Sequence, residues 1–333
     1  MGAKNTRSIA LKISVVIPIY NEEENIHALY DELSGVLRKL PHSSEIIFVD
    51  DGSSDRSLAL LEEIQADDPS VVVVSFRRNF GQTAAMSAGF DYAEGDIIIT
   101  MDGDLQNDPH DIPALIAKME TGYDVVTGWR FKRKDPFLSR RLPSMIANRI
   151  ISWITGVRLH DYGCTLKAFR KEVTSNIRLY GEMHRFIPAI ASGMGISFTE
   201  IKVNHRPRIH GTSKYGITRT LRVILDLMTV KFMLSYATRP LHVFGSVGFI
   251  ASSIGFFLAL YMTIQRQFFG IAMGNRPLLL FAILLIFMGI QFITIGLLAE
   301  LVVRTYHESQ HKPIYYVRKI LGRAEEKSAC AQA

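Results

Sequence analysis

Two aspartates separated by a single residue, Asp102 and Asp104, have the side-chain type and the spacing of a site that binds a divalent cation. They follow the apolar segment 97–101 (IIITM), which predicts a buried strand. Two carboxylates at a strand end can share a divalent cation and the diphosphate that the cation binds. A calcium loop is a poorer interpretation, because Asn107 stands where the EF-hand pattern requires glycine and Pro113 where it requires glutamate. An ordinary acidic turn is the remaining alternative, and we favour a metal site at Asp102 and Asp104.

A second pair of acids, Asp50 and Asp51, follows the apolar segment 46–49 (IIFV). A turn with a helix N-cap would explain Ser53 or Ser54, but it does not explain two adjacent acids at a strand end. A carboxylate there can accept hydrogen bonds from a base or a ribose. The sequence therefore predicts that Asp51 contacts a nucleotide.

A basic segment, 206–215 (RPRIHGTSKY), contains Arg208 and Lys214. A solvated loop or a patch for anionic lipid would have a similar composition. Facing a diphosphate, these two side chains would stabilise the charge that develops on the leaving group. The formal net charge of +6 fits nucleic acid, an anionic membrane or a phosphorylated substrate. Nucleic acid is not expected as a partner, because aromatic stacking platforms and a broad basic face are missing.

An alternation of strands and helices is expected to position these residues. Short apolar, β-branched segments predict buried strands at 13–19, 46–49, 71–76, 97–101 and 125–127. Segments with helical spacing lie between them at 25–40, 54–65, 83–93 and 109–121. This order predicts an α/β fold with a mainly parallel sheet and helices on both faces. Ligands of such sheets bind beyond the carboxyl ends of the strands, where the acids and arginines of this chain converge.

Two apolar segments, 241–264 and 277–303, are each longer than the about 20 residues needed to cross a bilayer core. Both are predicted to span a membrane. Basic residues cluster before the first and after the second, with only Arg266 and Arg276 between them. The positive-inside rule then places both termini and the soluble domain in the cytoplasm. The two cysteines form neither a zinc pattern nor a disulfide framework, which fits a reducing compartment.

The predicted domains follow from this division. They are a soluble domain at 1–215, an amphipathic interfacial helix region at 216–240, two transmembrane helices within 241–303, and a cytoplasmic tail at 304–333. A plain connecting helix is the alternative for 216–240. The small residues Gly245, Gly248 and Ser252 predict close helix packing in the first span and would also allow a homo-oligomer.

Six short motifs carry a resemblance to a known family. They are 16–22 (VIPIYNE), 49–53 (VDDGS), 78–82 (RNFGQ), 102–106 (DGDLQ), 161–164 (DYGC) and 211–215 (GTSKY). Together with two C-terminal spans, they resemble inverting family 2 glycosyltransferases of the Rossmann-like GT-A fold, in the branch that acts on polyprenyl phosphates. That branch includes dolichyl-phosphate mannose synthase, undecaprenyl-phosphate glucosyltransferases and the aminoarabinose lipid-carrier transferase.

The resemblance implies a role for each matching residue. The nucleoside of a nucleotide-sugar donor would be held by Pro18, Tyr20, Glu22, Val49 and Asp51. Mg²⁺ or Mn²⁺ would bind Asp102 and Asp104, with Gly103 between them in the donor site. The sugar-diphosphate or the lipid phosphate would be contacted by Gln106, Arg130, Arg208 and Lys214. Asp161 matches the family's aspartate near the acceptor, where it would act as a base or only orient the acceptor.

The resemblance also implies a reaction. A sugar, such as glucose from UDP-glucose, would pass with inversion to undecaprenyl phosphate at the bacterial inner membrane, for lipopolysaccharide or O-antigen modification. A transferase of the same fold with another acceptor, such as a growing polysaccharide, is one alternative. A polysaccharide conduit through the membrane would need more spans than the two predicted here, and the QxxRW signature of processive synthases is absent. A non-catalytic scaffold or flippase partner is another, against which the intact acids argue.

Overall fold

The computed structural model describes residues 11–131, 145, 148–149, 151–152, 156–177, 187–192, 195–207, 240–270, 277–309 and 315–323. The chain forms two compact units. The first consists of Met1–Val230 together with Lys312–Ala333, and the second consists of Lys231–His311. The polypeptide therefore leaves the first unit, forms the second, and returns to the first.

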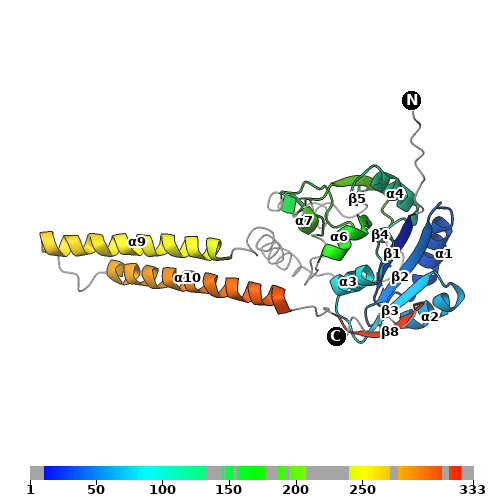
Figure 1. The fold of residues 1–333 in the computed structure, drawn as a ribbon, viewed down its shortest axis with the longest axis horizontal. Helices are drawn as coiled ribbons and strands as arrows, with labels where there is room; N and C mark the ends of the chain where they lie inside the picture. The colour runs from blue at the N-terminus through cyan, green and yellow to red at the C-terminus, as the bar shows by residue number, and fades with distance from the viewer. Residues whose placement is uncertain are drawn as a thin grey trace, which may run out of the picture. The chain divides into compact units, whose positions relative to one another are not determined.

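A mixed sheet is the centre of the first unit (Figure 1). Its strands are β1 (Lys12–Ile19), β2 (Ser43–Asp50), β3 (Val71–Phe76), β4 (Ile97–Thr100), β5 (Val125–Arg130), β6 (Lys167–Arg170), β7 (Phe198–Val203) and β8 (Val317–Leu321). They lie in the order β7-β5-β6-β4-β1-β2-β3-β8. Neighbours in β4-β1-β2-β3 are parallel, as are β5 and β7, whereas β6 and β8 are antiparallel to their neighbours. The predicted mainly parallel α/β sheet is confirmed, and β6, β7 and β8 are additions to it.

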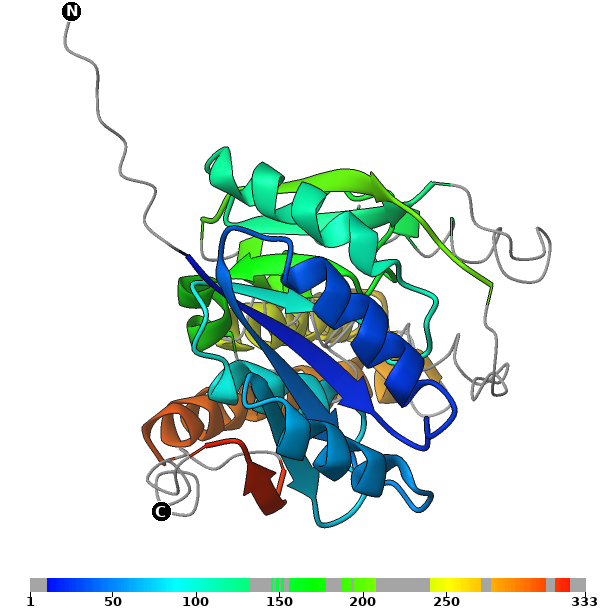
Figure 2. The same cartoon turned by 90° about the vertical axis from the view of Figure 1, so that its right-hand side faces the viewer.

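Helices cover both faces of this sheet, as expected (Figure 2). They are α1 (Ile26–Leu37), α2 (Ser57–Asp67), α3 (Gln82–Tyr92), the 3₁₀ turn η1 (Pro109–Asp111), α4 (Ile112–Glu120), α6 (Lys171–Asn176) and α7 (Ile187–Ser192). Side chains alternate between the two faces along a strand. Ile17 and Ile19 of β1 share a hydrophobic core with α1, α2 and α4. Val16 lies against Gly89 of α3, where a Cβ would overlap the valine.

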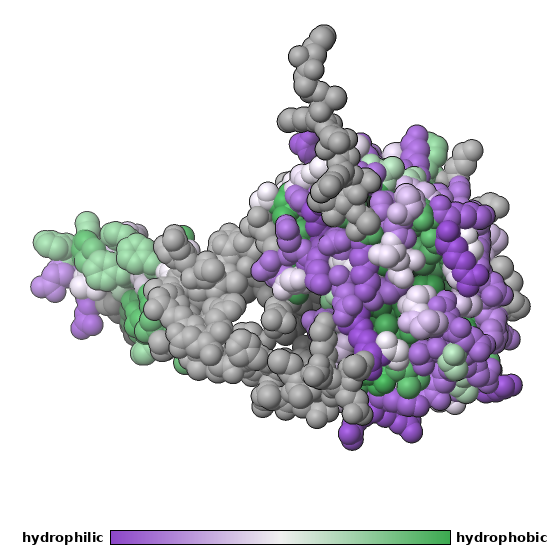
Figure 3. Space-filling view, turned by 45° about the vertical axis from the view of Figure 1, so that its right-hand side comes forward, coloured by the Kyte–Doolittle hydropathy of each residue, from purple (hydrophilic) through white to green (hydrophobic). Residues whose placement is uncertain are grey.

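The second unit is a hairpin of two long helices, α9 (Pro240–Phe269) and α10 (Pro277–Ser309). Both are long and apolar enough to cross a membrane, over Phe244–Phe269 and Pro277–Ala299. Most of their side chains are exposed, unlike those of a soluble core helix, and the surface visible in Figure 3 is mainly hydrophobic. An apolar surface of this size needs a cover such as lipid.

Small residues bring α9 and α10 together. A Cβ on Gly248 would overlap the carbonyl oxygen of Gly289, and one on Gly255 would lie 2.6 Å from the carbonyl oxygen of Ala282. Ser252 donates a hydrogen bond to the carbonyl oxygen of Ile286 at 3.5 Å. The close packing predicted for Gly248 and Ser252 is therefore made inside the hairpin, so these residues do not by themselves indicate an oligomer.

Candidate active site

Acidic residues meet at one edge of the sheet. β2 ends at Asp50, β4 ends two residues before Asp102, and β1 lies between these two strands. Because the three strands are parallel, their carboxyl ends lie on the same side. The structure thus brings together the two acidic motifs that are about 50 residues apart in the sequence.

Asp51 is buried, with 3% of its surface exposed. Its Oδ1 accepts a hydrogen bond from the backbone N–H of Phe80 at 2.7 Å, and its Oδ2 accepts one from Gly81 at 2.9 Å. Burial and the neighbouring charge of Asp50 raise the pKa of Asp51 to about 6, although the two N–H groups act in the opposite direction. A carboxylate has about four acceptor positions, so the predicted contact with a nucleotide is compatible with these bonds.

Asp102 and Asp104 lie in the turn after β4, where polar side chains form hydrogen bonds with Asp102. Asp102 accepts hydrogen bonds from Gln82 Nε2 at 2.8 Å and from Thr165 Oγ1 at 2.8 Å, and its N–H donates to Asn107 Oδ1. Burial and the nearby charge of Asp104 raise the pKa of Asp102 to about 6. Two carboxylates that disfavour each other's ionisation would be stabilised by a shared cation, and an all-oxygen donor set suits Mg²⁺ or Mn²⁺.

The backbone of this turn is strained. Leu105, which follows Asp104, has a φ of 60°, a value that non-glycine residues rarely adopt. Asp104 is 6% exposed and accepts a hydrogen bond from the N–H of Gln106 at 3.1 Å. A Cβ on Gly103 would lie 2.6 Å from Cδ1 of Ile19, the flexible end of a side chain, so alanine would require only a small shift. Strain of this kind is often found at functional turns.

Arg130 and Asp161 form a buried bidentate pair. Nε of Arg130 donates to Oδ2 of Asp161 at 2.7 Å and Nη2 donates to Oδ1 at 2.9 Å. Burial alone would lower the pKa of Arg130, but the hydrogen bonds and charge of Asp161 outweigh it and raise that pKa. Gly163 N–H also donates to Oδ1 of Asp161, at 3.1 Å. Both oxygens of this carboxylate are occupied by these hydrogen bonds, so the geometry favours an orienting role for Asp161.

Several residues that the sequence analysis did not select belong to the same region. Gln82, Asn107 and Thr165 bond to Asp102 or its backbone, and each of the three is inside or directly next to a quoted motif. Lys167 is 2% exposed, and its Nζ donates to the carbonyl oxygen of Tyr162 at 3.3 Å. Burial lowers the pKa of Lys167 to about 8. Only their position beside the motifs could have singled them out.

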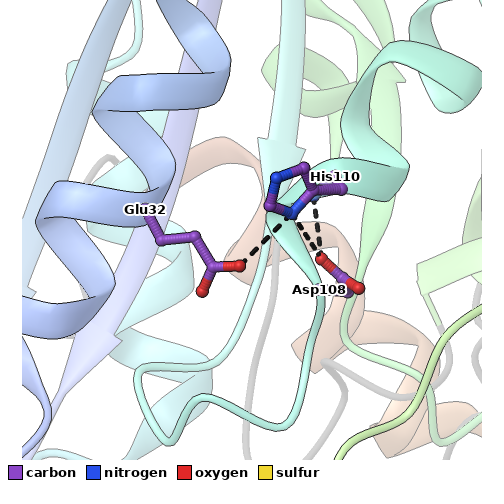
Figure 4. A group of neighbouring side chains, drawn as sticks. All are labelled: Glu32, Asp108 and His110. Atoms are coloured by element: carbon purple, nitrogen blue, oxygen red, sulfur yellow. Dashed lines mark hydrogen bonds and ion pairs between the residues drawn. The ribbon is translucent and has the colours of Figure 1, made fainter.

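A second cluster, formed by Glu32, Asp108 and His110, has ligand types that could hold a metal (Figure 4). Nδ1 of His110 lies 3.2 Å from Glu32 Oε1 and 3.0 Å from Asp108 Oδ1. Arg206 already neutralises both carboxylates, with a bidentate contact to Glu32 at 2.8 and 2.6 Å and a contact to Asp108 at 2.7 Å. We therefore interpret this cluster as an ion-pair network that fastens residues 204–206 to the turn after Asp104.

The other predicted site residues differ in placement. Pro18 and Val49 are paired across β1 and β2, and Val49 is fully buried, so only its backbone could reach a ligand. Tyr20 and Glu22 are partly exposed beyond the end of β1. Gln106 donates a long bond of 3.5 Å to the carbonyl oxygen of Arg206. Arg208 and Lys214 lie outside the described residues.

Comparisons with known proteins identify the family of this chain. Residues 14–178 match the family described as Glycosyl transferase family 2. Dodecaprenyl-phosphate galacturonate synthase of Rhizobium johnstonii is 44% identical over 315 residues, 93% of each chain. An undecaprenyl-phosphate 4-deoxy-4-formamido-L-arabinose transferase of Pseudomonas fluorescens is 40% identical over 93% of this chain and 89% of its own.

A solved structure supports the fold. Glucosyl-3-phosphoglycerate synthase of Mycobacterium tuberculosis, in complex with Mn²⁺ and UDP-glucose, superposes with a TM-score of 0.53 and 20% identity over 66% of this chain and 79% of that chain. At that identity the likeness concerns the fold alone. With a relative 44% identical over nearly its whole length, the chain belongs to glycosyl transferase family 2 and is a glycosyltransferase of the GT-A fold.

Proposed function

We propose that this protein transfers a sugar from a UDP-sugar to undecaprenyl phosphate or a similar polyprenyl phosphate, for the modification of a cell-envelope glycan. The observation that carries the proposal is the position of Asp51, Asp102 and Arg130 at the carboxyl ends of β2, β4 and β5, with Asp161 bound to Arg130. The same chain has two helices that are long and apolar enough to cross a membrane. The two relatives above are both named for a polyprenyl phosphate, dodecaprenyl phosphate in one and undecaprenyl phosphate in the other, which supports a polyprenyl-phosphate acceptor.

In this proposal Asp51 contacts the nucleoside, and Asp102 and Asp104 hold Mg²⁺ or Mn²⁺. The bound cation would supply electrostatic stabilisation of the departing diphosphate. Arg130 is held by Asp161 through Nε and Nη2, and Nη1, which has no hydrogen bond to the residues that the structure describes, would bind a phosphate oxygen. Arg208 and Lys214 of the basic segment 206–215 would also neutralise the charge on the departing diphosphate.

The acceptor phosphate is the nucleophile. A phosphate monoester is already anionic at neutral pH, so its attack on the anomeric carbon requires no base. Asp161 then serves by orienting Arg130, and the carbon inverts its configuration in a single displacement. The bond from the anomeric carbon to the donor diphosphate breaks as the bond to the acceptor oxygen forms.

The connectivity of the chain supports a cytoplasmic active site. The first unit precedes α9, and β8, which follows α10, pairs with β3 of the same unit. If both helices cross the membrane, both of their outer ends must therefore lie on one side. The distribution of basic residues favours the cytoplasmic side, and for a bacterial chain this would be the inner membrane.

The identity of the transferred sugar has to be determined by experiment, because three candidates follow from the sequence analysis and the relatives. The sequence analysis expects UDP-glucose, whereas the names of the relatives contain galacturonate and 4-deoxy-4-formamido-L-arabinose. The test is to incubate the purified full chain in detergent with undecaprenyl phosphate, Mn²⁺ or Mg²⁺, and radiolabelled UDP forms of these three sugars, and to count the label in the organic phase.

We expect label from one donor, lost with EDTA and in Asp104→Asn. The matched control is Asp124→Asn, because Asp124 lies at the other end of β5 and bonds only to the Ser197 region and Arg170 among the residues described. Failure of every donor with folded protein and accessible lipid would refute the polyprenyl-phosphate proposal and favour a non-catalytic scaffold or another acceptor.

A further inference from the structure

The loop between β3 and α3, residues 77–81, connects the two acidic motifs. Phe80 and Gly81 donate their backbone N–H groups to the carboxylate of Asp51. The next residue, Gln82, donates from Nε2 to Oδ1 of Asp102 at 2.8 Å. Three consecutive residues thus hold the carboxylates proposed for the nucleoside and for the metal, so any shift of this loop moves both.

One side of the loop rests on the strand-end turn of β2. Gly52, directly after Asp51, has a φ of 68°, and a Cβ there would lie 2.7 Å from the backbone nitrogen of Asn79 and overlap Arg78. The loop backbone therefore lies directly on the glycine. The remaining support has to come from its other side.

That support comes from the residues that follow α10. The N–H of Arg77 donates to the carbonyl oxygen of Tyr316 at 3.1 Å, and the rings of Phe80 and Tyr316 lie 6.0 Å apart. Tyr315 stacks on Phe76 with ring centroids 5.0 Å apart, and its hydroxyl donates to Asp91 Oδ2 at 2.8 Å. Two adjacent tyrosines therefore contact the loop and the strand that leads into it.

β8 fixes these tyrosines in place. It runs antiparallel to β3, so its start lies beside the loop, and the pairing is irregular between Ser75 and Phe76, where the loop begins. Beyond its far end, Arg323 forms ion pairs with Glu45 at 3.1 Å and with Glu94 at 3.3 Å. An irregularity of this kind re-aims the chain next to a site.

We propose that Tyr316, supported by Tyr315 and β8, is a positioning residue for the nucleotide-sugar donor: it fixes the 77–81 loop, and through it the carboxylate of Asp51. The inference rests on the proposed function, in which Asp51 contacts the nucleoside. Because the chain reaches β8 only after α10, the donor side of the catalytic unit is completed by a segment that is made after both apolar helices.

The exposure of Tyr316 makes the inference testable. Tyr316 is 67% exposed. Removing its side chain should therefore change the position of the loop but lower the free energy of unfolding only slightly. We compare the full chain in detergent with Tyr316→Ala and Tyr316→Phe. The matched control is Lys319→Gln, which removes an exposed ion pair between β8 and Glu62 of α2 and none of the contacts of Tyr316 given above.

The measurements are the KM for the donor, the KM for the lipid and kcat, together with the Kd for UDP in the presence of Mn²⁺. We expect Tyr316→Ala to raise the donor KM and the UDP Kd by about 3- to 10-fold, the size of effect expected from one lost aromatic contact. The lipid KM and kcat should not change. Tyr316→Phe and Lys319→Gln should behave as the unaltered chain does.

Unchanged donor KM and UDP Kd in Tyr316→Ala would overturn the inference while leaving the proposed function intact. Equal losses in Lys319→Gln would also overturn it, because they would indicate a general role of β8. If Tyr316→Ala lowers the thermal unfolding midpoint, Phe80→Leu tests the same contact from the loop side and should raise the UDP Kd similarly. UDP binding without transfer to lipid would refute the acceptor alone, and no UDP binding by the unaltered chain would refute both proposals.

Discussion

The Arg130–Asp161 pair distinguishes an orienting aspartate from a catalytic base. Asp161→Asn replaces one carboxylate oxygen by an amide that cannot accept, so one of the two bonds at 2.7 and 2.9 Å is lost. The side chains are 15% and 4% exposed, so Arg130 would be left as a buried, half-paired charge. Breaking a buried pair by removing one partner costs about 3–5 kcal/mol. If that cost raises the free energy of the transition state, kcat/KM should fall by about a hundred- to a few-thousand-fold.

The assay is a double-mutant cycle on kcat/KM for transfer, with Asp161→Asn, Arg130→Lys and the double variant. If Asp161 acts by orienting Arg130, the double variant should lose little more than the worse single variant. The pH profile of Asp161→Asn should keep its shape, because no essential base has been removed. Additive losses, an altered acidic limb, or an unimpaired Asp161→Asn would each refute the reasoning.

The remaining predictions concern the metal, the ion-pair cluster and the turn at Gly52. The pKa values of Asp51 and Asp102 are raised to about 6 without metal, so the stability that their protonated forms contribute is present below pH 4 and is lost as the pH rises through about 6. Mn²⁺ binds the ionised form, so it should raise the thermal unfolding midpoint more at pH 7.5 than at pH 5, and equal shifts would contradict this. His110→Ala should leave the Kd for Mn²⁺ unchanged, whereas Asp104→Asn should raise it; the reverse result, by calorimetry, would make the Glu32 cluster the metal site. Gly52→Ala should lower the free energy of unfolding by about 1–3 kcal/mol, because its φ is 68° and its Cβ would overlap Arg78. Gly35→Ala in α1, where nothing lies within 4 Å, should instead stabilise by about 0.5–1 kcal/mol in denaturant unfolding, and equal effects of the two changes would refute the argument.

Much of the fold was predictable because its signals are local. The apolar runs that became β1 to β5 are short, β-branched and separated by helical segments, so their order alone indicated a parallel α/β sheet. The acids at 50–51 and 102–104 could be assigned to one edge because parallel strands share the side of their carboxyl ends. Two apolar segments longer than a bilayer core could be recognised from composition.

β6, β7 and β8 could not be predicted in the same way. Segments 167–170 (KAFR), 198–203 (FTEIKV) and 317–321 (VRKIL) are short and carry charges, and β7 and β8 are edge strands, where charged side chains are common. Each becomes a strand only because a partner distant in the sequence offers an open edge. The segment expected as a tail therefore contains a strand of the sheet.

The sequence by itself determined which residues could do chemistry and at which strand ends they stand, because residue type and periodicity are local properties. Only the tertiary structure decided their partners: Asp161 with Arg130, the Glu32 cluster with Arg206, and Asp51 with a loop that Tyr316 supports. These contacts join residues 29 to 239 positions apart, and no local pattern encodes a pairing over such separations.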